Sequence, residues 1–66
     1  MKIVVNGEPR VLDDGTTVHT LAVAVLDRPT GVAVAVNGEV VPRSAWARTA
    51  LRDDDRVEVV TARQGG

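Results

Sequence analysis

The residues that could do chemistry lie at the end of this chain, where Arg63, Gln64, Gly65 and Gly66 follow a valine-rich segment. Two consecutive glycines contribute no burial and cost more entropy to order than any other pair, which predicts a mobile tail. Four extended residues reach roughly 13 Å. A carboxylate on Gly66 can therefore enter a narrow active site of another protein. The plainer interpretation is that glycines at a chain end are tolerated filler.

Three adjacent carboxylates, on Asp53, Asp54 and Asp55, are the second group with possible chemistry. A metal ion needs ligands at spacings that fold around it, whereas Asp-rich triplets are typical of tight solvated turns. His19 has no Cys, His or carboxylate partner at ligand spacing. We therefore interpret the triplet as a turn and His19 as structural, and we expect no metal site.

Composition limits the remaining possibilities. The chain has 66 residues, of which 44% are hydrophobic, mostly Val and Ala, with one Trp and no Phe or Tyr. So small a chain forms one domain with a thin core, and its valines favour strands, so we expect no large pocket. The absence of cysteine excludes a disulfide framework, a thiolate metal site and a thiol nucleophile.

The patterns of charge and hydropathy argue against nucleic acid and membrane as partners and against secretion. The formal net charge is −1, and the arginines are scattered along the chain, so no basic stripe for nucleic acid is present. The longest apolar run, 32–36, is far too short to span a membrane, and the first residues lack the pattern of a signal peptide. We expect a cytoplasmic protein that binds neither nucleic acid nor membrane.

Two hairpins are predicted to build most of the sheet that carries the tail. Alternating apolar residues at 3 and 5 precede Asn6-Gly7, and a second Asn-Gly pair, Asn37-Gly38, follows the apolar run 32–36. Asn-Gly between such runs is the strongest short hairpin signal. The return arms are 8–12 and 39–41, the latter ended by Pro42. A final strand at 56–60 leads outward into the tail.

One main helix is predicted between the hairpins. Thr16 or Thr17 can cap it, and an apolar stripe follows at i, i+3, i+4, i+7 and i+8, formed by Val18, Leu21, Ala22, Val25 and Leu26. Arg28-Pro29 ends it. Ser44 is expected to cap a short helical turn at 45–47 that places Trp46 over the core.

This order of elements predicts an α+β roll, in which the helix packs on one face of a mixed sheet. A right-handed crossover through the helix makes the first and last strands parallel neighbours at the centre of the sheet. We expect a domain at 1–62 and a flexible tail at 63–66.

The sequence resembles the ubiquitin-like β-grasp sulfur carriers, and most closely the ThiS family of bacterial thiamine biosynthesis. The resemblance covers the whole chain. Its more specific part is Val-Pro-Arg-x-x-Trp, from Val41 to Trp46, and a terminal Gly-Gly is shared by many ubiquitin-like modifiers. Further matching segments are Thr17-Val18 with Leu21, and Val34-Ala35-Val36-Asn37. Family members often carry Asp-Gly-Asp where this chain has Asp53-Asp54-Asp55, and because Asp tolerates the left-handed conformation we expect the turn to persist.

The resemblance implies a specific chemistry at Gly66. An adenylating enzyme of the ThiF type uses ATP to convert the Gly66 carboxylate into an acyl-adenylate, and a persulfide-bearing sulfur donor displaces AMP to leave a thiocarboxylate. A ThiG-type thiazole synthase then accepts the sulfur. Gly65 is needed to thread the tail, while Arg63 and Gln64 help to dock it. The chain itself is then not an enzyme, supplies no catalytic residue and binds no cofactor.

Partner contact is expected on the outward sheet face near the tail, with Val60 and Val41 as candidates because an exposed apolar patch often marks an interface. Three alternatives remain open from the sequence. They are a carrier of the same fold serving molybdopterin or another sulfur-containing product, a ubiquitin-like protein modifier joined through Gly66 to lysines, and an interaction domain whose tail has no chemistry.

Overall fold

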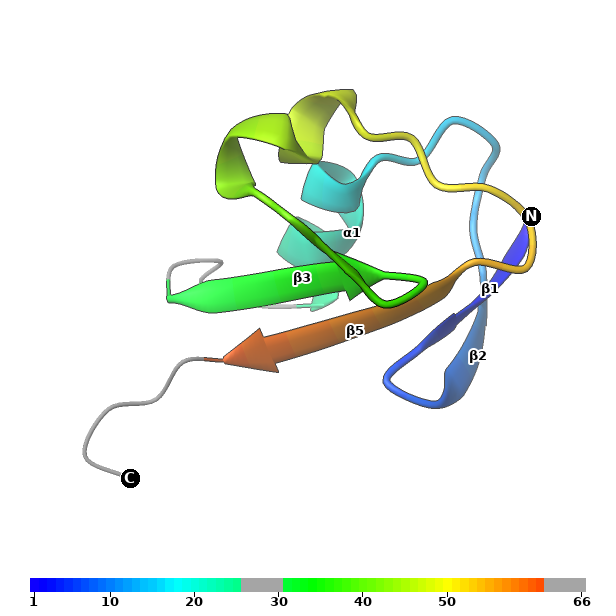
Figure 1. Cartoon of the computed structure of the whole chain (residues 1–66). Coiled ribbons are helices and arrows are strands. Elements are labelled where there is room, and N and C mark those ends of the chain that lie inside the picture. Colours follow the sequence, from blue (N-terminus) through cyan, green and yellow to red (C-terminus); the bar gives the residue numbers. More distant parts are fainter. Residues whose placement is uncertain (26–30, 62–66) are drawn as a thin grey trace.

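The computed structural model describes residues 1–25 and 31–61, and within them one sheet is crossed by one α-helix (Figure 1). The sheet has five strands in the order β2-β1-β5-β3-β4. The elements along the chain are β1 (Lys2–Val5), β2 (Glu8–Val11), α1 (Val18–Val25), β3 (Val32–Val36), β4 (Glu39–Val41), the 3₁₀ helix η1 (Arg43–Arg48) and β5 (Arg56–Thr61).

The predicted mixed sheet is confirmed. The first and last strands, β1 and β5, are parallel neighbours, with Val4 opposite Arg56 and Val5 opposite Val57. The β1–β2, β3–β4 and β3–β5 pairs are antiparallel. Because β5 lies between β1 and β3, the strand that leads to the tail is the central strand of the sheet.

Both Asn-Gly hairpin turns form as predicted. Asn6 and Gly7 have φ values of 50° and 82°, and Asn37 and Gly38 have φ values of 51° and 86°. Positive φ at both central residues defines the turn whose twist matches that of the two flanking strands, and Asn and Gly are the residues that adopt it most easily. The acidic turn also uses the left-handed region, since Asp54 has φ 70°.

Helix α1 starts with the cap predicted at Thr17. The Thr17 Oγ1 accepts a hydrogen bond from the Thr20 N–H at 3.2 Å, which satisfies one of the free donors of the first turn. The buried residues of the helix are Val18, Leu21 and Ala22, which belong to the predicted apolar stripe. Leu26 and the helix stop at Arg28-Pro29 lie outside the described residues.

Trp46 closes the core, as predicted. Its side chain is 2% exposed, and its Nε1–H donates to the Val41 carbonyl at 2.9 Å. The predicted Ser44 cap is wrong, because Pro42 is the N-cap residue of η1 and no side chain bonds there. Pro42 instead accepts the Ala45 N–H at its carbonyl oxygen at 2.8 Å, so the backbone itself closes the first turn.

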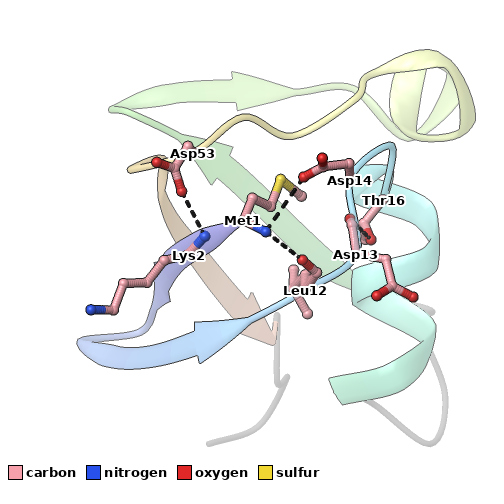
Figure 2. Close-up of polar contacts among 7 residues, drawn as sticks. All are labelled: Met1, Lys2, Leu12, Asp13, Asp14, Thr16 and Asp53. Carbon is pink, nitrogen blue, oxygen red and sulfur yellow. Dashed lines mark hydrogen bonds and ion pairs between the residues drawn. The ribbon is translucent and has the colours of Figure 1, made fainter.

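The start of the chain is tied to two loops (Figure 2). The Met1 nitrogen donates to the Leu12 carbonyl at 2.7 Å and lies 3.4 Å from the Asp14 carboxylate. The Lys2 N–H donates to the Asp53 carboxylate at 2.7 Å. The hydrogen bond from Lys2 to Asp53 holds the acidic turn beside the first strand, directly before β5 begins. Across the described residues, no helix has the length and apolar character to cross a membrane.

Candidate functional site

The base of the tail is fixed by the central strand. β5 ends at Thr61, on the opposite side of the molecule from the N-terminal end of β1 (Figure 1). The predicted site residues Arg63, Gln64, Gly65 and Gly66 lie outside the described residues, so their roles stay predictions. The structure shows what holds the strand from which they follow.

Two asparagine side chains tie β5 to the hairpin turns on either side of it. Asn6 Oδ1 accepts the Val59 N–H at 2.8 Å, and Asn6 Nδ2 donates to the Val59 carbonyl at 3.2 Å. Asn37 Oδ1 accepts the Arg56 N–H at 2.9 Å, and Asn37 Nδ2 donates to the Asp55 carboxylate at 3.0 Å. Asn37 therefore holds the start of β5, and Asn6 holds its second half.

The outward face of the sheet carries exposed apolar residues beside the end of β5. Val60 is 61% exposed and pairs with Ala33 of β3, while Val40 of β4 is 72% exposed and pairs with Ala35. We call these four residues the outer patch. It contains Val60, as predicted for the outward face.

The expected placement of Val41 on that face is corrected. Val41 pairs with the buried Val34, and its half-buried side chain packs against the core. Successive side chains of a strand point to opposite faces, so the exposed residue of β4 is the preceding one, Val40.

The acidic turn is used for structure. Asp53 accepts the Lys2 N–H, and Asp55 accepts the Arg52 N–H at 2.8 Å. His19 is exposed on α1. Within residues 1–25 and 31–61, no group of three or more His, Cys, Asp or Glu side chains is placed to hold a metal ion, and no charged side chain is buried.

An open depression lies at the other end of β5. It is lined from the β3–β4 hairpin, from η1 and from the loop before β5, and the lining includes Asn37, Val40, Ala45 and Asp55. Asn37 and Asp55 lie at the start of β5, so this depression is remote from the strand end that leads to the tail.

A mixed five-stranded sheet with one helix on its inner face, and with its central strand leading to a Gly-Gly end, defines a protein of the ubiquitin-like β-grasp class. The family model named ThiS family matches residues 3–66. The chain belongs to the ThiS family.

Individual relatives agree with this assignment. The sulfur carrier protein ThiS of Escherichia coli is 33% identical over 66 residues, with both chains covered completely. A crystal structure of the thiamine biosynthesis protein ThiS from Geobacter metallireducens superimposes with a TM-score of 0.85 at 35% identity, again over all of both chains. The sequence similarity to the first relative and the shared fold with the second therefore both extend over the full length of the chains compared.

Longer proteins also contain a similar segment. Thiazole synthases of Magnetococcus marinus and Paramagnetospirillum magneticum are 41% and 39% identical to this chain over 66 residues. The chain spans 20% of the length of each of these two relatives.

Sequence reasoning missed the side-chain roles of Asn6 and Asn37. The Asn-Gly pattern predicts both residues only as turn formers, because a local pattern does not reveal which strand will lie beside a turn. The available signal was that Asn occupies the first turn position twice, where Gly or Asp would also serve.

Proposed function

We propose that this chain is a sulfur carrier that delivers sulfur for the thiazole ring of thiamine, with Gly66 as the carboxyl-terminal residue that bears the sulfur. The observation that carries the proposal is the ThiS family match over residues 3–66, which includes the Gly-Gly pair. The proposal divides the chain into a folded domain, 1–62, and a tail, 63–66.

The proposed chemistry begins with activation, because a carboxylate has no good leaving group and is a poor electrophile at neutral pH. An adenylating enzyme of the ThiF type therefore first joins the Gly66 carboxylate to AMP and releases pyrophosphate from ATP. A persulfide on the sulfur donor then attacks the acyl carbon and AMP leaves. The attack forms a C–S bond and gives an acyl disulfide that keeps the S–S bond of the persulfide. A dithiol reductant cleaves that S–S bond, which leaves a thiocarboxylate on Gly66 and a thiol on the donor, while the dithiol is oxidised to a disulfide. A cysteine-free chain has no thiol to hold sulfur, which supports its terminal carboxyl group as the carrier.

In this proposal the chain is a substrate of its partner enzymes and not an enzyme itself. The activating enzyme binds the ATP, and the carrier binds no cofactor or metal ion. A ThiG-type thiazole synthase is the acceptor, which is supported by the two thiazole synthases that contain a segment similar to this chain.

Docking of the partners is assigned to the tail and to the outer patch. Gly65 allows the tail to pass through a narrow channel, and Arg63 and Gln64 contact its entrance. Val60 lies three residues before Arg63, where the tail begins, and is 61% exposed, so a partner that binds the tail can contact this side chain as well.

The test is the intact mass of the chain after incubation with ATP, a ThiF-type enzyme, a persulfide donor and a dithiol reductant. We expect a mass increase equal to the exchange of one oxygen for one sulfur, and no increase in a chain that lacks Gly65 and Gly66. Addition of a thiazole synthase with its other substrates should return the original mass.

An unchanged mass in the complete mixture, when the E. coli carrier is converted under the same conditions, would contradict the proposal. Covalent attachment of the chain to lysines of other proteins would instead identify a protein modifier. Return of the original mass with molybdopterin synthase but not with thiazole synthase would overturn the assigned acceptor.

A further inference from the structure

We propose that Asn6 is a positioning residue for sulfur transfer, because its side chain fixes the last part of β5 and thereby the point from which the tail leaves the domain. The inference rests on the proposed function, in which the tail enters a partner enzyme. It concerns a residue that is 60 positions before Gly66 in the sequence.

The Asn6 side chain makes the hydrogen bonds to β5 that the backbone of a further β1 residue would otherwise make. The Asn6 N–H donates to the Val57 carbonyl at 2.9 Å, which continues the parallel ladder between β1 and β5. The chain then turns away at Gly7, which has φ 82°. The carboxamide continues the ladder in its place, since it both accepts from and donates to the backbone of Val59 at 2.8 Å and 3.2 Å.

This carboxamide is the last tie on one edge of β5. On the β3 edge, pairing continues through Val60 and Thr61, which lie opposite Ala33 and Val32. On the β1 edge, the ladder pairs end at Val57, and the only further tie from residues 1–25 and 31–61 is the one from Asn6 to Val59. Without it, the final residues of β5 are held from one side only.

Loosening the end of β5 should weaken recognition of the tail. Each backbone residue that must be ordered again when a partner binds lowers affinity by about tenfold. The penalty falls on binding, so it raises the KM for the carrier and leaves kcat of the activating enzyme nearly unchanged.

Asn37 offers a matched control. It occupies the same turn position with a nearly identical φ of 51°, and its carboxamide also makes two hydrogen bonds, one of them to the β5 backbone. Those bonds lie at Asp55 and at Arg56, the first residue of β5, at the end of the strand that is far from the tail. Loss of the Asn37 carboxamide therefore removes two hydrogen bonds from an equivalent turn, as loss of the Asn6 carboxamide does, but leaves the last part of β5 unchanged.

The experiment compares Asn6→Gly and Asn37→Gly, since glycine keeps both turns while removing both carboxamides. For each variant we would measure urea unfolding, amide hydrogen exchange at Val59 and Val60, and steady-state adenylation by a ThiF-type enzyme. Both variants should lose similar stability. Only Asn6→Gly should show faster exchange at these amides and a KM raised by about tenfold.

A second substitution keeps the test decisive if Asn6→Gly fails to fold. Asn6→Asp retains an acceptor for the Val59 N–H but places a carboxylate oxygen against the Val59 carbonyl, so its KM should lie between those of the wild type and Asn6→Gly. Asn37→Asp is its control.

Equal KM values for the Asn6 and Asn37 variants would overturn the inference, and so would unchanged exchange at Val59 and Val60. A wild-type chain that is not adenylated at all would instead refute the proposed function. In that case the exchange measurement still decides whether Asn6 holds the end of β5.

Discussion

Trp46 is the residue on which the packing of the core against the inner face of the sheet most depends. It is the only aromatic side chain in the sequence, and at 2% exposure it is the largest side chain that is fully buried among the described residues. The other buried side chains are mostly valines with Ile3, Leu21, Leu51 and Ala22. A core built from small side chains cannot readily fill a space that an indole leaves, because each residue has few rotamers with which to adapt.

We expect Trp46→Phe to lower the free energy of unfolding by about 2 kcal/mol, through lost volume and through loss of the hydrogen bond to the Val41 carbonyl. Urea unfolding measures the change. Arg43→Ala is the control, since the Arg43 guanidinium only lies over the ring at 5.0 Å and is exposed, so its loss should cost less than about 1 kcal/mol. Equal losses in both variants would contradict the assigned role of the indole.

The proposed chemistry limits the size of the side chain most strongly at position 65, which is occupied by Gly65. We expect Gly65→Val to leave urea unfolding unchanged and to abolish adenylation, because a branched side chain next to Gly66 blocks a narrow channel. Gln64→Val is a control for the added apolar bulk one position earlier and should retain measurable adenylation. Normal activation of Gly65→Val would show that the tail does not have to thread.

At the scale of elements, local sequence patterns predicted the hairpins and the helix. They did not predict features that depend on contacts between elements distant in the sequence. Asn6-Gly7 and Asn37-Gly38 identified both hairpins, and the apolar stripe from Val18 identified the helix. The wrong cap at Ser44 arose because a hydroxyl before a helical turn is a local signal, whereas Pro42 already closes that turn through its carbonyl.

The predicted outward placement of Val41 on β4 is wrong for a physical reason. In a strand as short as β4, Glu39–Val41, the residue pattern does not define the inward side, and Val40 and Val41 are equally apolar. Only the pairing with β3 decides that Val41 faces the core and that Val40 faces outward. The outer patch could therefore not be assembled from the sequence alone.

The outer patch leads to a prediction about sheet-face recognition. Val60→Ser should weaken binding of the adenylating enzyme by about tenfold, because burying a valine contributes roughly 1.5 kcal/mol. Val11→Ser is the matched control, since Val11 of β2 is a strand valine that is 80% exposed at the far edge of the same sheet. Titration calorimetry measures both affinities. A similar affinity for the two variants would remove the patch from the interface.

At the scale of the whole molecule, stability comes from apolar packing and backbone pairing more than from charge. The described residues contain one ion pair, between the Met1 nitrogen and Asp14 at 3.4 Å, and Asp14 is 95% exposed. No charged side chain is buried in the described part of the chain. Exposed ion pairs contribute little, since water and salt screen them.

We therefore expect the free energy of unfolding to be nearly independent of salt. Raising the ionic strength from about 0.01 M to about 0.15 M shortens the Debye length from about 30 Å to about 8 Å and should change stability by less than about 0.5 kcal/mol. Urea unfolding at fixed pH measures this. A larger change would reveal a charge network that the described contacts do not contain.

The central position of β5 has a mechanical consequence for a carrier that is gripped by its end. A pull along β5 acts on the β1 and β3 ladders together, and their hydrogen bonds lie across the strand direction, so they are loaded in shear and resist as a group. An edge strand pulled outward would instead unzip one bond at a time. If a partner enzyme pulls on the chain beyond Thr61, as the proposed function requires, both ladders would therefore resist the pull together.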